Sequence, residues 1–279
     1  MTTSKGPPFF LLSGAGNDFI ALLDRPVPAA ETVRAWCRRG LSVGADGLFS
    51  LRRAAAGRYV LDYANADGAR ADLCLNAARC AARLAFDQEP SASSVQIETA
   101  AGTLTAEPLD ESRTAVLVSA PGQGRSMTLQ ANGHALPGRR IDVGVPHFVL
   151  WWQTDLDQAP VASLGPILRS HPDLGREGAN VHFVDLNLPE GFRIRSFERG
   201  VEAETLACGT GVVASAACAI AEGRLSLPLV AATRSGCELR LEAAAAAPDG
   251  AARWRLSGDA RIVASGRIRD QATLLPSAP

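Results

Sequence analysis

The sequence predicts a mixed α/β fold of the α+β kind, in which each of two halves wraps a mainly antiparallel sheet around one central helix. Short strand-like runs bounded by Gly, Pro, Asn and Asp recur along the chain. Two Ala-rich segments, residues 72–86 and 208–223, have the length and composition of largely buried helices. Because the order of strands, helix and strands occurs twice, with a cysteine at the first turn of each helix, we interpret the chain as an internal duplication.

The first half begins with two strands joined by a Gly-rich turn, in residues 8–24. A further strand entering a loop follows at 58–68, before the first helix. Alternating apolar and polar residues then predict strands within 95–109 and 114–122.

The second half repeats this plan. Strand patterns occupy 127–136, 139–152, 179–188 and 191–200, and the second helix follows. The remaining strands are expected within 227–236, 237–243 and 252–269. The Ala-rich run before Pro248-Asp249-Gly250 could begin a helix, but these three residues favour a hairpin turn.

The composition argues against several classes of protein. The chain has 279 residues and a formal net charge of -1, without the basic runs of a nucleic-acid-binding protein, so a small neutral or zwitterionic ligand fits better. No apolar stretch approaches the ~20 residues of a membrane span, and the N-terminal segment does not resemble a signal peptide. We therefore expect a cytoplasmic protein that binds neither nucleic acid nor membranes.

The scarcity of lysine and the cysteine spacing bear on cofactors. Lys5 is the only lysine, and its place near the N-terminus makes a Schiff base with pyridoxal phosphate very unfavourable. The six cysteines form neither a disulfide-dense scaffold nor a C-x-x-C zinc motif. The sequence thus predicts free thiols, no metal and no cofactor.

Two cysteines carry the chemical prediction. Cys208 is followed by Gly-Thr-Gly and then by helix, and Cys74 has the equivalent place in the first half. Unpaired N–H groups at a helix start favour negative charge, which predicts a lowered thiol pKa and a place for a substrate carboxylate. Two such thiols facing one carbon could invert it, because one removes the α-proton and the other delivers a proton to the opposite face.

Several motifs together resemble the diaminopimelate epimerase family: GAGNDF, NADG before Cys74, PHFV, ERG and above all ETLACGTG. The resemblance spans most of the chain in the family's order. It implies that Cys74 and Cys208 are the acid/base pair and that His147 and Glu198 tune the thiols. It also implies residues that bind the substrate, its carboxylate or the helix starts: Asn17, Asn65, Leu75, Asn76, Asn180, Arg199, Gly209 and Thr210.

The resemblance further implies two pseudo-symmetric domains with the last strand returning to the first. We expect one half to span residues 1–120, completed by 264–279, and the other to span 121–263. A homodimer, an amino-acid substrate and no cofactor are implied as well.

The sequence departs from the family pattern around the expected substrate. Leu75 and Ala77 replace the glycines beside the first cysteine, and Val145 replaces an Asn. The segment 198–204 is one residue longer and lacks a second glycine, and His182 replaces the commoner Asn or Glu. Interconversion of LL- and meso-diaminopimelate is the first expectation. The alternatives are a racemase or epimerase for another amino acid, a non-catalytic amino-acid-binding protein, or a related isomerase with a different reaction.

Each signal also has an ordinary structural interpretation. We assign the four other cysteines, Cys37, Cys80, Cys218 and Cys237, to the core. His147 could be a hydrogen-bonded structural histidine, and Glu198-Arg199 a solvated ion pair. Residues 14–17 do not form a dinucleotide loop, since they join two strands and open no helix.

Overall fold

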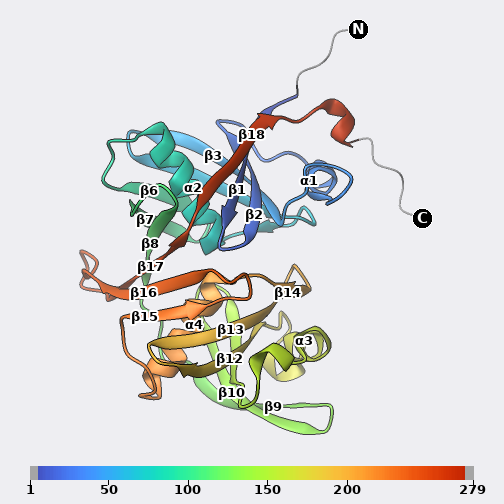
Figure 1. The fold of residues 1–279 in the computed structure, drawn as a ribbon, viewed down its shortest axis with the longest axis vertical. Coiled ribbons are helices and arrows are strands. Elements are labelled where there is room, and N and C mark those ends of the chain that lie inside the picture. Colours follow the sequence, from blue (N-terminus) through green and yellow to red (C-terminus); the bar gives the residue numbers. More distant parts are fainter. Residues whose placement is uncertain (1–5, 274–279) are drawn as a thin grey trace. The chain divides into compact units, whose positions relative to one another are not determined.

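The computed structural model describes residues 6–273, which form two compact units (Figure 1). Among the described residues, unit 1 comprises 6–116 and 259–273, and unit 2 comprises Leu117–Gly258. Lys5 lies outside the described residues. Among the helices of residues 6–273, none combines the length and the hydrophobicity that a membrane span requires.

Unit 1 is a mixed sheet with one central helix. Its strands follow one another in the sheet in the order β18, β1, β2, β3, β4, β6 and β7, with β5 also paired to β4. The β2–β3 and β4–β6 pairs are parallel and the others are antiparallel. The elements are β1 (Pro8–Gly14), β2 (Asn17–Leu23), α1 (Ala30–Cys37), β3 (Gly47–Ala55), β4 (Arg58–Asn65), β5 (Arg70–Ala71), α2 (Leu75–Gln88), β6 (Val95–Thr99), β7 (Gly102–Pro108), β18 (Arg261–Arg267) and the 3-10 helix η3 (Asp270–Thr273). The strand β8 (Arg113–Ser119) begins in unit 1 and ends in unit 2.

Unit 2 has the same plan. Its strands follow the order β9, β10, β11, β12, β13, β15, β16 and β17, with β14 also paired to β13. The elements are β9 (Arg125–Ala131), β10 (His134–Asp142), β11 (Pro146–Trp151), η1 (Leu156–Gln158), α3 (Val161–Arg169), η2 (Pro172–Leu174), β12 (Asn180–Leu188), β13 (Gly191–Glu198), β14 (Ala203–Thr205), α4 (Gly209–Ala221), β15 (Leu229–Ala232), β16 (Glu238–Ala244) and β17 (Arg253–Asp259).

The two units correspond element by element, which confirms the predicted duplication. In each, an antiparallel pair leads to a parallel neighbour, an antiparallel strand follows, and a short strand precedes the central helix. The predicted hairpin before β17 is also present, since β16 and β17 are antiparallel. The structure adds the strand β3 and the helices α1 and α3, which the sequence patterns did not reveal.

The strand registers define equivalent positions in the two units. In the parallel pairs, Phe19 of β2 lies opposite Gly47 of β3, and His147 of β11 lies opposite Asn180 of β12. The antiparallel pairs β3–β4 and β12–β13 then match as well, since Phe49 lies opposite Tyr63 as His182 lies opposite Ser196. The resulting equivalent residues are Phe19 and His147, Phe49 and His182, Tyr63 and Ser196, Asn65 and Glu198, Ala71 and Thr205, and Cys74 and Cys208.

Candidate active site

Cys74 and Cys208 each stand immediately before a central helix, at its N-cap. Both have extended backbone, with φ of -137° for Cys74 and -123° for Cys208. The predicted placement at helix starts is therefore confirmed. N-cap residues adjoin the unpaired N–H groups of the first turn, so both thiols lie where the helix favours negative charge.

Cys74 is half-buried. Its Sγ atom accepts a hydrogen bond from the backbone N–H of Ala77 at 3.5 Å, as a capping oxygen would in an ordinary helix. The next residue, Leu75, begins α2 with its side chain only 2% exposed. The branched side chain that replaces a family glycine is thus packed in the interior.

A polar network holds the start of α2 against the sheet of unit 1. The Asn76 amide donates to Oδ1 of Asn17, and Nδ2 of Asn17 donates to Asp46 at 3.1 Å. Arg79, which is fully buried, donates to Oδ1 of Asn76 at 2.8 Å. At the end of β4, Asn65 accepts a bond from the Tyr63 hydroxyl at 2.9 Å. Three of the five predicted residues of this half, Asn17, Cys74 and Asn76, therefore present polar groups at one helix start.

Cys208 differs from Cys74 in its burial, being only 3% exposed. Its sulfur lies 3.6 Å from the Thr210 hydroxyl, and that hydroxyl and the Gly211 N–H both lower the thiol pKa. Burial is the largest influence, however, and together with the Glu198 carboxylate it raises the pKa of Cys208 well above its usual value. The prediction of a lowered pKa is therefore wrong for this cysteine, because desolvation outweighs the helix start.

Glu198 lies at the end of β13, and its carboxylate is close enough to hydrogen-bond the Cys208 thiol. It also accepts a bond from the hydroxyl of Thr205 on β14. A protonated thiol beside an ionised carboxylate is an acid/base pair in which the proton can pass from sulfur to oxygen.

Asn180 and Arg199 complete the predicted residues of unit 2. The Asn180 side chain accepts a bond from the Arg199 backbone N–H at 2.8 Å, which fixes the start of the turn after β13. The Arg199 guanidinium pairs with Glu177 at 2.7 Å, but Glu177 is largely exposed. Exposed ion pairs contribute little free energy, so a bound anion could displace this partner.

A family model described as diaminopimelate epimerase matches residues 9–122 and 140–247. The chain belongs to this family. It is 34% identical to the diaminopimelate epimerase of Aquifex aeolicus (strain VF5), over 84% of this chain and 89% of that one. It is also 34% identical to the diaminopimelate epimerase of Gemmatimonas aurantiaca, over 93% of this chain and 98% of that one.

Solved structures show that the fold of the diaminopimelate epimerase family extends to more distant proteins. A probable proline racemase from Agrobacterium radiobacter K84 superposes with a TM-score of 0.71 at 14% identity, covering 95% of both chains. A hydroxyproline epimerase from Agrobacterium vitis gives a TM-score of 0.70 at 12% identity, covering 97% of this chain and 94% of that one. Both likenesses support the pseudo-symmetric α+β fold.

The turn after Glu198, where the sequence departs from the family pattern, differs in length from its counterpart in unit 1. The equivalent turn of unit 1 is residues 66–68, whereas residues 199–202 form it here, one residue longer. Glu202 adopts a left-handed φ of 55° that favours glycine. Its carboxylate compensates by accepting bonds from Gly200 N at 3.0 Å and from Arg169 at 2.9 Å.

His147, on β11, lies in a buried hydrogen-bonded chain. Its Nδ1 atom is 2.8 Å from Nε2 of His182, and Nδ1 of His182 is 2.8 Å from the Ser196 hydroxyl. All three side chains are buried. Burial, and then the neighbouring His182 and Arg199, hold the pKa of His147 well below its usual range, and burial lowers the pKa of His182 to about 3. Both imidazoles are therefore neutral at physiological pH.

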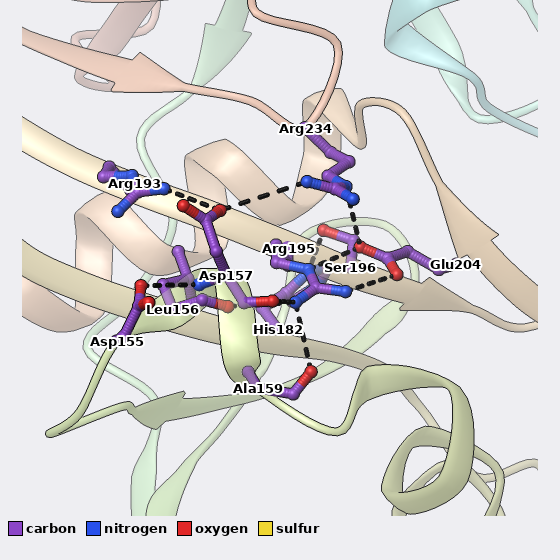
Figure 2. Close-up of polar contacts among 10 residues, drawn as sticks. All are labelled: Asp155, Leu156, Asp157, Ala159, His182, Arg193, Arg195, Ser196, Glu204 and Arg234. Carbon is purple, nitrogen blue, oxygen red and sulfur yellow. Dashed lines mark hydrogen bonds and ion pairs between the residues drawn. The ribbon is translucent and has the colours of Figure 1, made fainter.

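An arginine network fixes the strand that carries Ser196 and Glu198. Figure 2 shows Arg195 of β13 bound to Glu204 of β14 and to backbone oxygens of the segment 156–159, beside His182 and Ser196. Its Nη1 atom donates to the carbonyls of Leu156, Asp157 and Ala159 at 2.9–3.1 Å. Because this guanidinium has a carboxylate and three carbonyls as partners, it holds β13 and β14 in a defined register.

Ser196 and Thr205 are not among the residues predicted from the sequence. A signal for Ser196 was present, since Ser196 and Glu198 are two residues apart in one strand and so share a face. The four other cysteines are free. Cys37, Cys80 and Cys218 are buried, as predicted, but Cys237 is only half-buried beside the turn before β16 and is not a core residue.

Proposed function

We propose that this protein is a cofactor-independent isomerase that interconverts LL- and meso-diaminopimelate. The observation that carries the proposal is the presence of a cysteine at the N-cap of each central helix, in a chain of the diaminopimelate epimerase family. The named relatives at 34–37% identity support the substrate assignment.

In the proposed reaction, one cysteine acts as thiolate and the other as thiol. The thiolate takes the α-proton, and the thiol gives its proton to the opposite face of the carbon. For Cys208 to act as the base, its proton first passes to Glu198, leaving a thiolate and a neutral carboxyl. The N–H groups at the two helix starts would stabilise the charge that develops on the substrate carboxylate.

We assign the remaining predicted residues to the substrate. Asn76, Gly209 and Thr210 would support the helix starts and the α-carboxylate, and Leu75, whose side chain is packed in the interior, would contribute its backbone at the start of α2. Asn17, Asn65, Asn180 and Arg199 would hold the rest of the substrate, while His147 would tune a thiol. The homodimer, the cytoplasmic location and the domain limits at 120/121 and 263/264 remain predictions.

A second candidate is an epimerase or racemase for a different amino acid. Val145 favours it, because its side chain can neither donate nor accept a hydrogen bond to a distal polar group of the substrate. The chemistry at the two thiols would be unchanged in that case.

The test is α-proton exchange in deuterium oxide with a panel of amino acids that includes LL- and meso-diaminopimelate. We expect deuterium at the α-carbon and inversion of diaminopimelate. Exchange should fall by about 10²- to 10⁴-fold in Cys74→Ala and Cys208→Ala. The matched controls are Cys80→Ala and Cys218→Ala, which lie deeper in the same helices and should retain exchange.

The outcomes separate the candidates. Exchange of another amino acid but not of diaminopimelate would support the second candidate. The third outcome is that the parent shows no exchange but binds an amino acid, and that the double variant Cys74→Ala plus Cys208→Ala binds it equally tightly. The chain would then be a binding protein and the proposal would be wrong.

A further inference from the structure

Three equivalent positions are filled very differently in the two units. In unit 1 they hold Phe19, Phe49 and Tyr63, whose rings pack with centroids 6.1 Å apart for Phe19–Phe49 and 6.0 Å for Phe19–Tyr63. In unit 2 the same positions hold the buried chain of His147, His182 and Ser196. Since aromatic side chains satisfy this part of the fold in unit 1, the fold itself does not require polar groups there.

Polar groups at these positions are costly unless their hydrogen bonds are made. A buried imidazole or hydroxyl without a partner loses a substantial part of its hydration free energy. The hydrogen bonds among these three side chains give a partner to Nδ1 of His147, to both ring nitrogens of His182 and to the Ser196 hydroxyl. Within residues 6–273, Nε2 of His147 is buried and has no hydrogen-bond partner. One polar atom thus remains available at the end of an otherwise satisfied chain.

The direction of the hydrogen bond between Ser196 and His182 determines whether Nε2 of His147 carries a proton. If the Ser196 hydroxyl donates to His182, then His182 donates to Nδ1 of His147, and His147 carries its proton on Nε2. If His182 instead donates to Ser196, His147 must donate from Nδ1, and its Nε2 is an acceptor. In both arrangements, the tautomer of His147 is set by the bond that its other ring nitrogen makes.

We propose that His182 and Ser196 are positioning residues that hold the His147 ring in one orientation and one tautomer, leaving Nε2 as its hydrogen-bonding atom toward the reaction. This inference rests on the proposed function, in which His147 tunes a thiol.

His182 also contacts the helix that carries the second cysteine. The backbone of Gly211, in the first turn of α4, lies so close to the imidazole that a Cβ atom at this position would be 2.2 Å from Cε1 of His182. Gly211 also donates its N–H toward Cys208. The ring is therefore clamped between its two hydrogen-bond partners and the helix start, which limits its rotation.

The test compares His182→Leu, His182→Gln and Ser196→Ala with the parent. Leu removes both hydrogen bonds, Gln keeps a group able to bond His147, and Ser196→Ala removes only the far partner. The matched control is Phe49→Leu, which changes the equivalent position of unit 1. The readouts are the ¹⁵N chemical shifts of the histidine ring nitrogens, which report tautomers, and kcat and KM for α-proton exchange.

We expect a single His147 tautomer in the parent and in His182→Gln. His182→Leu and Ser196→Ala should give mixed tautomers. In His182→Leu, kcat should fall on the order of 10-fold or more, because part of the acid/base contribution is lost, while KM stays within about twofold. Phe49→Leu should leave His147 and kcat close to the parent.

A single tautomer in both His182→Leu and Ser196→Ala would overturn the proposal, as would mixed tautomers in the parent. An equal loss of kcat in Phe49→Leu would indicate a general packing effect and would also overturn it. If His182→Leu does not fold, the tautomers seen in Ser196→Ala and His182→Gln decide whether the proposal holds. Should the parent show no exchange with any amino acid, the proposed function fails, but the ring shifts still test the positioning role.

Discussion

The starts of α2 and α4 place a cysteine at the same N-cap but give the two thiols different surroundings. Cys74 is half-buried and bonded to the Ala77 N–H. Cys208 is buried, with Thr210, Gly211 and the Glu198 carboxylate beside it. At the position equivalent to Glu198, unit 1 has the neutral Asn65.

This difference shows that a duplicated scaffold can give two equivalent thiols different surroundings. His147 and Glu198, which we propose as the titratable partners of the thiols, lie in unit 2, whereas unit 1 fills the equivalent positions with Phe19 and Asn65. Equal backbone geometry therefore does not give equal thiols. Burial and a neighbouring carboxylate raise the pKa of Cys208, and they outweigh the opposite influence of the helix start.

The largest expected effect comes from removing the carboxylate that distinguishes the two sites. Glu198→Gln should lower α-proton exchange on the order of 10²-fold, because Cys208 loses its proton acceptor. The same change should lower the pKa of Cys208, since the Glu198 charge raises it. Ultraviolet titration of the thiolate measures this shift, with Glu242→Gln on β16, a half-buried carboxylate outside the candidate site, as control. An unchanged exchange rate would show that Glu198 takes no part.

The next effect compares the third residue after each cysteine. Gly211→Ala should lower the free energy of unfolding by about 1–3 kcal/mol, because the new methyl group would collide with the His182 ring. The reciprocal change in unit 1, Ala77→Gly, should cost only about 0.5–1 kcal/mol through backbone entropy. Urea denaturation measures both values, and equal losses would contradict the tight packing at Gly211.

A smaller effect is the pH dependence of stability. In the folded chain the pKa of His182 is about 3 and the pKa of His147 is also strongly lowered. An unfolded histidine has a pKa of about 6.5, so below that pH the unfolded chain binds more protons than the folded chain does. Stability is therefore full above about pH 6.5 and falls as the pH drops, by up to about 1.4 kcal/mol per pH unit for each histidine. His182→Gln should show a shallower fall in denaturation curves between about pH 6.5 and 4. An identical slope would mean that His182 is not buried as a neutral ring.

The smallest effect concerns the reactivity of the two thiols. At about pH 8, iodoacetamide should modify Cys74 at least about 10-fold faster than Cys208, because Cys208 is buried and its pKa is raised. Peptide mapping by mass spectrometry gives both rates in one sample. The unfolded chain is the control, in which the difference should vanish. Faster labelling of Cys208 in the folded protein would reverse the comparison.

The sequence predicted most of the strands, though not β3, and it predicted both central helices and the place of Cys74 and Cys208 at the helix starts, because these depend on local signals such as apolar alternation, Gly turns and helix starts. It missed α3, which contains Gly165 and Pro166, residues that disfavour helix when considered alone. Packing compensates there, since Gly165 lies against the Phe197 ring and Leu164 and Leu168 enter the core. The direction of the Cys208 pKa and the bond between His182 and Ser196 could not be predicted, because burial and strand register arise only in the folded chain.

The pairing of β1 with β18 has a consequence for biosynthesis. Pro8 lies opposite Arg267 in that antiparallel pair, so the sheet of unit 1 uses segments from both ends of the chain. During synthesis, unit 2 can fold before β18 has left the ribosome. Until then, β1 is paired with β2 on one side only, and the backbone groups of its other edge have no strand to pair with. Early termination before β18 would therefore leave the half that bears Cys74 with an open edge, although that half was the first to be translated.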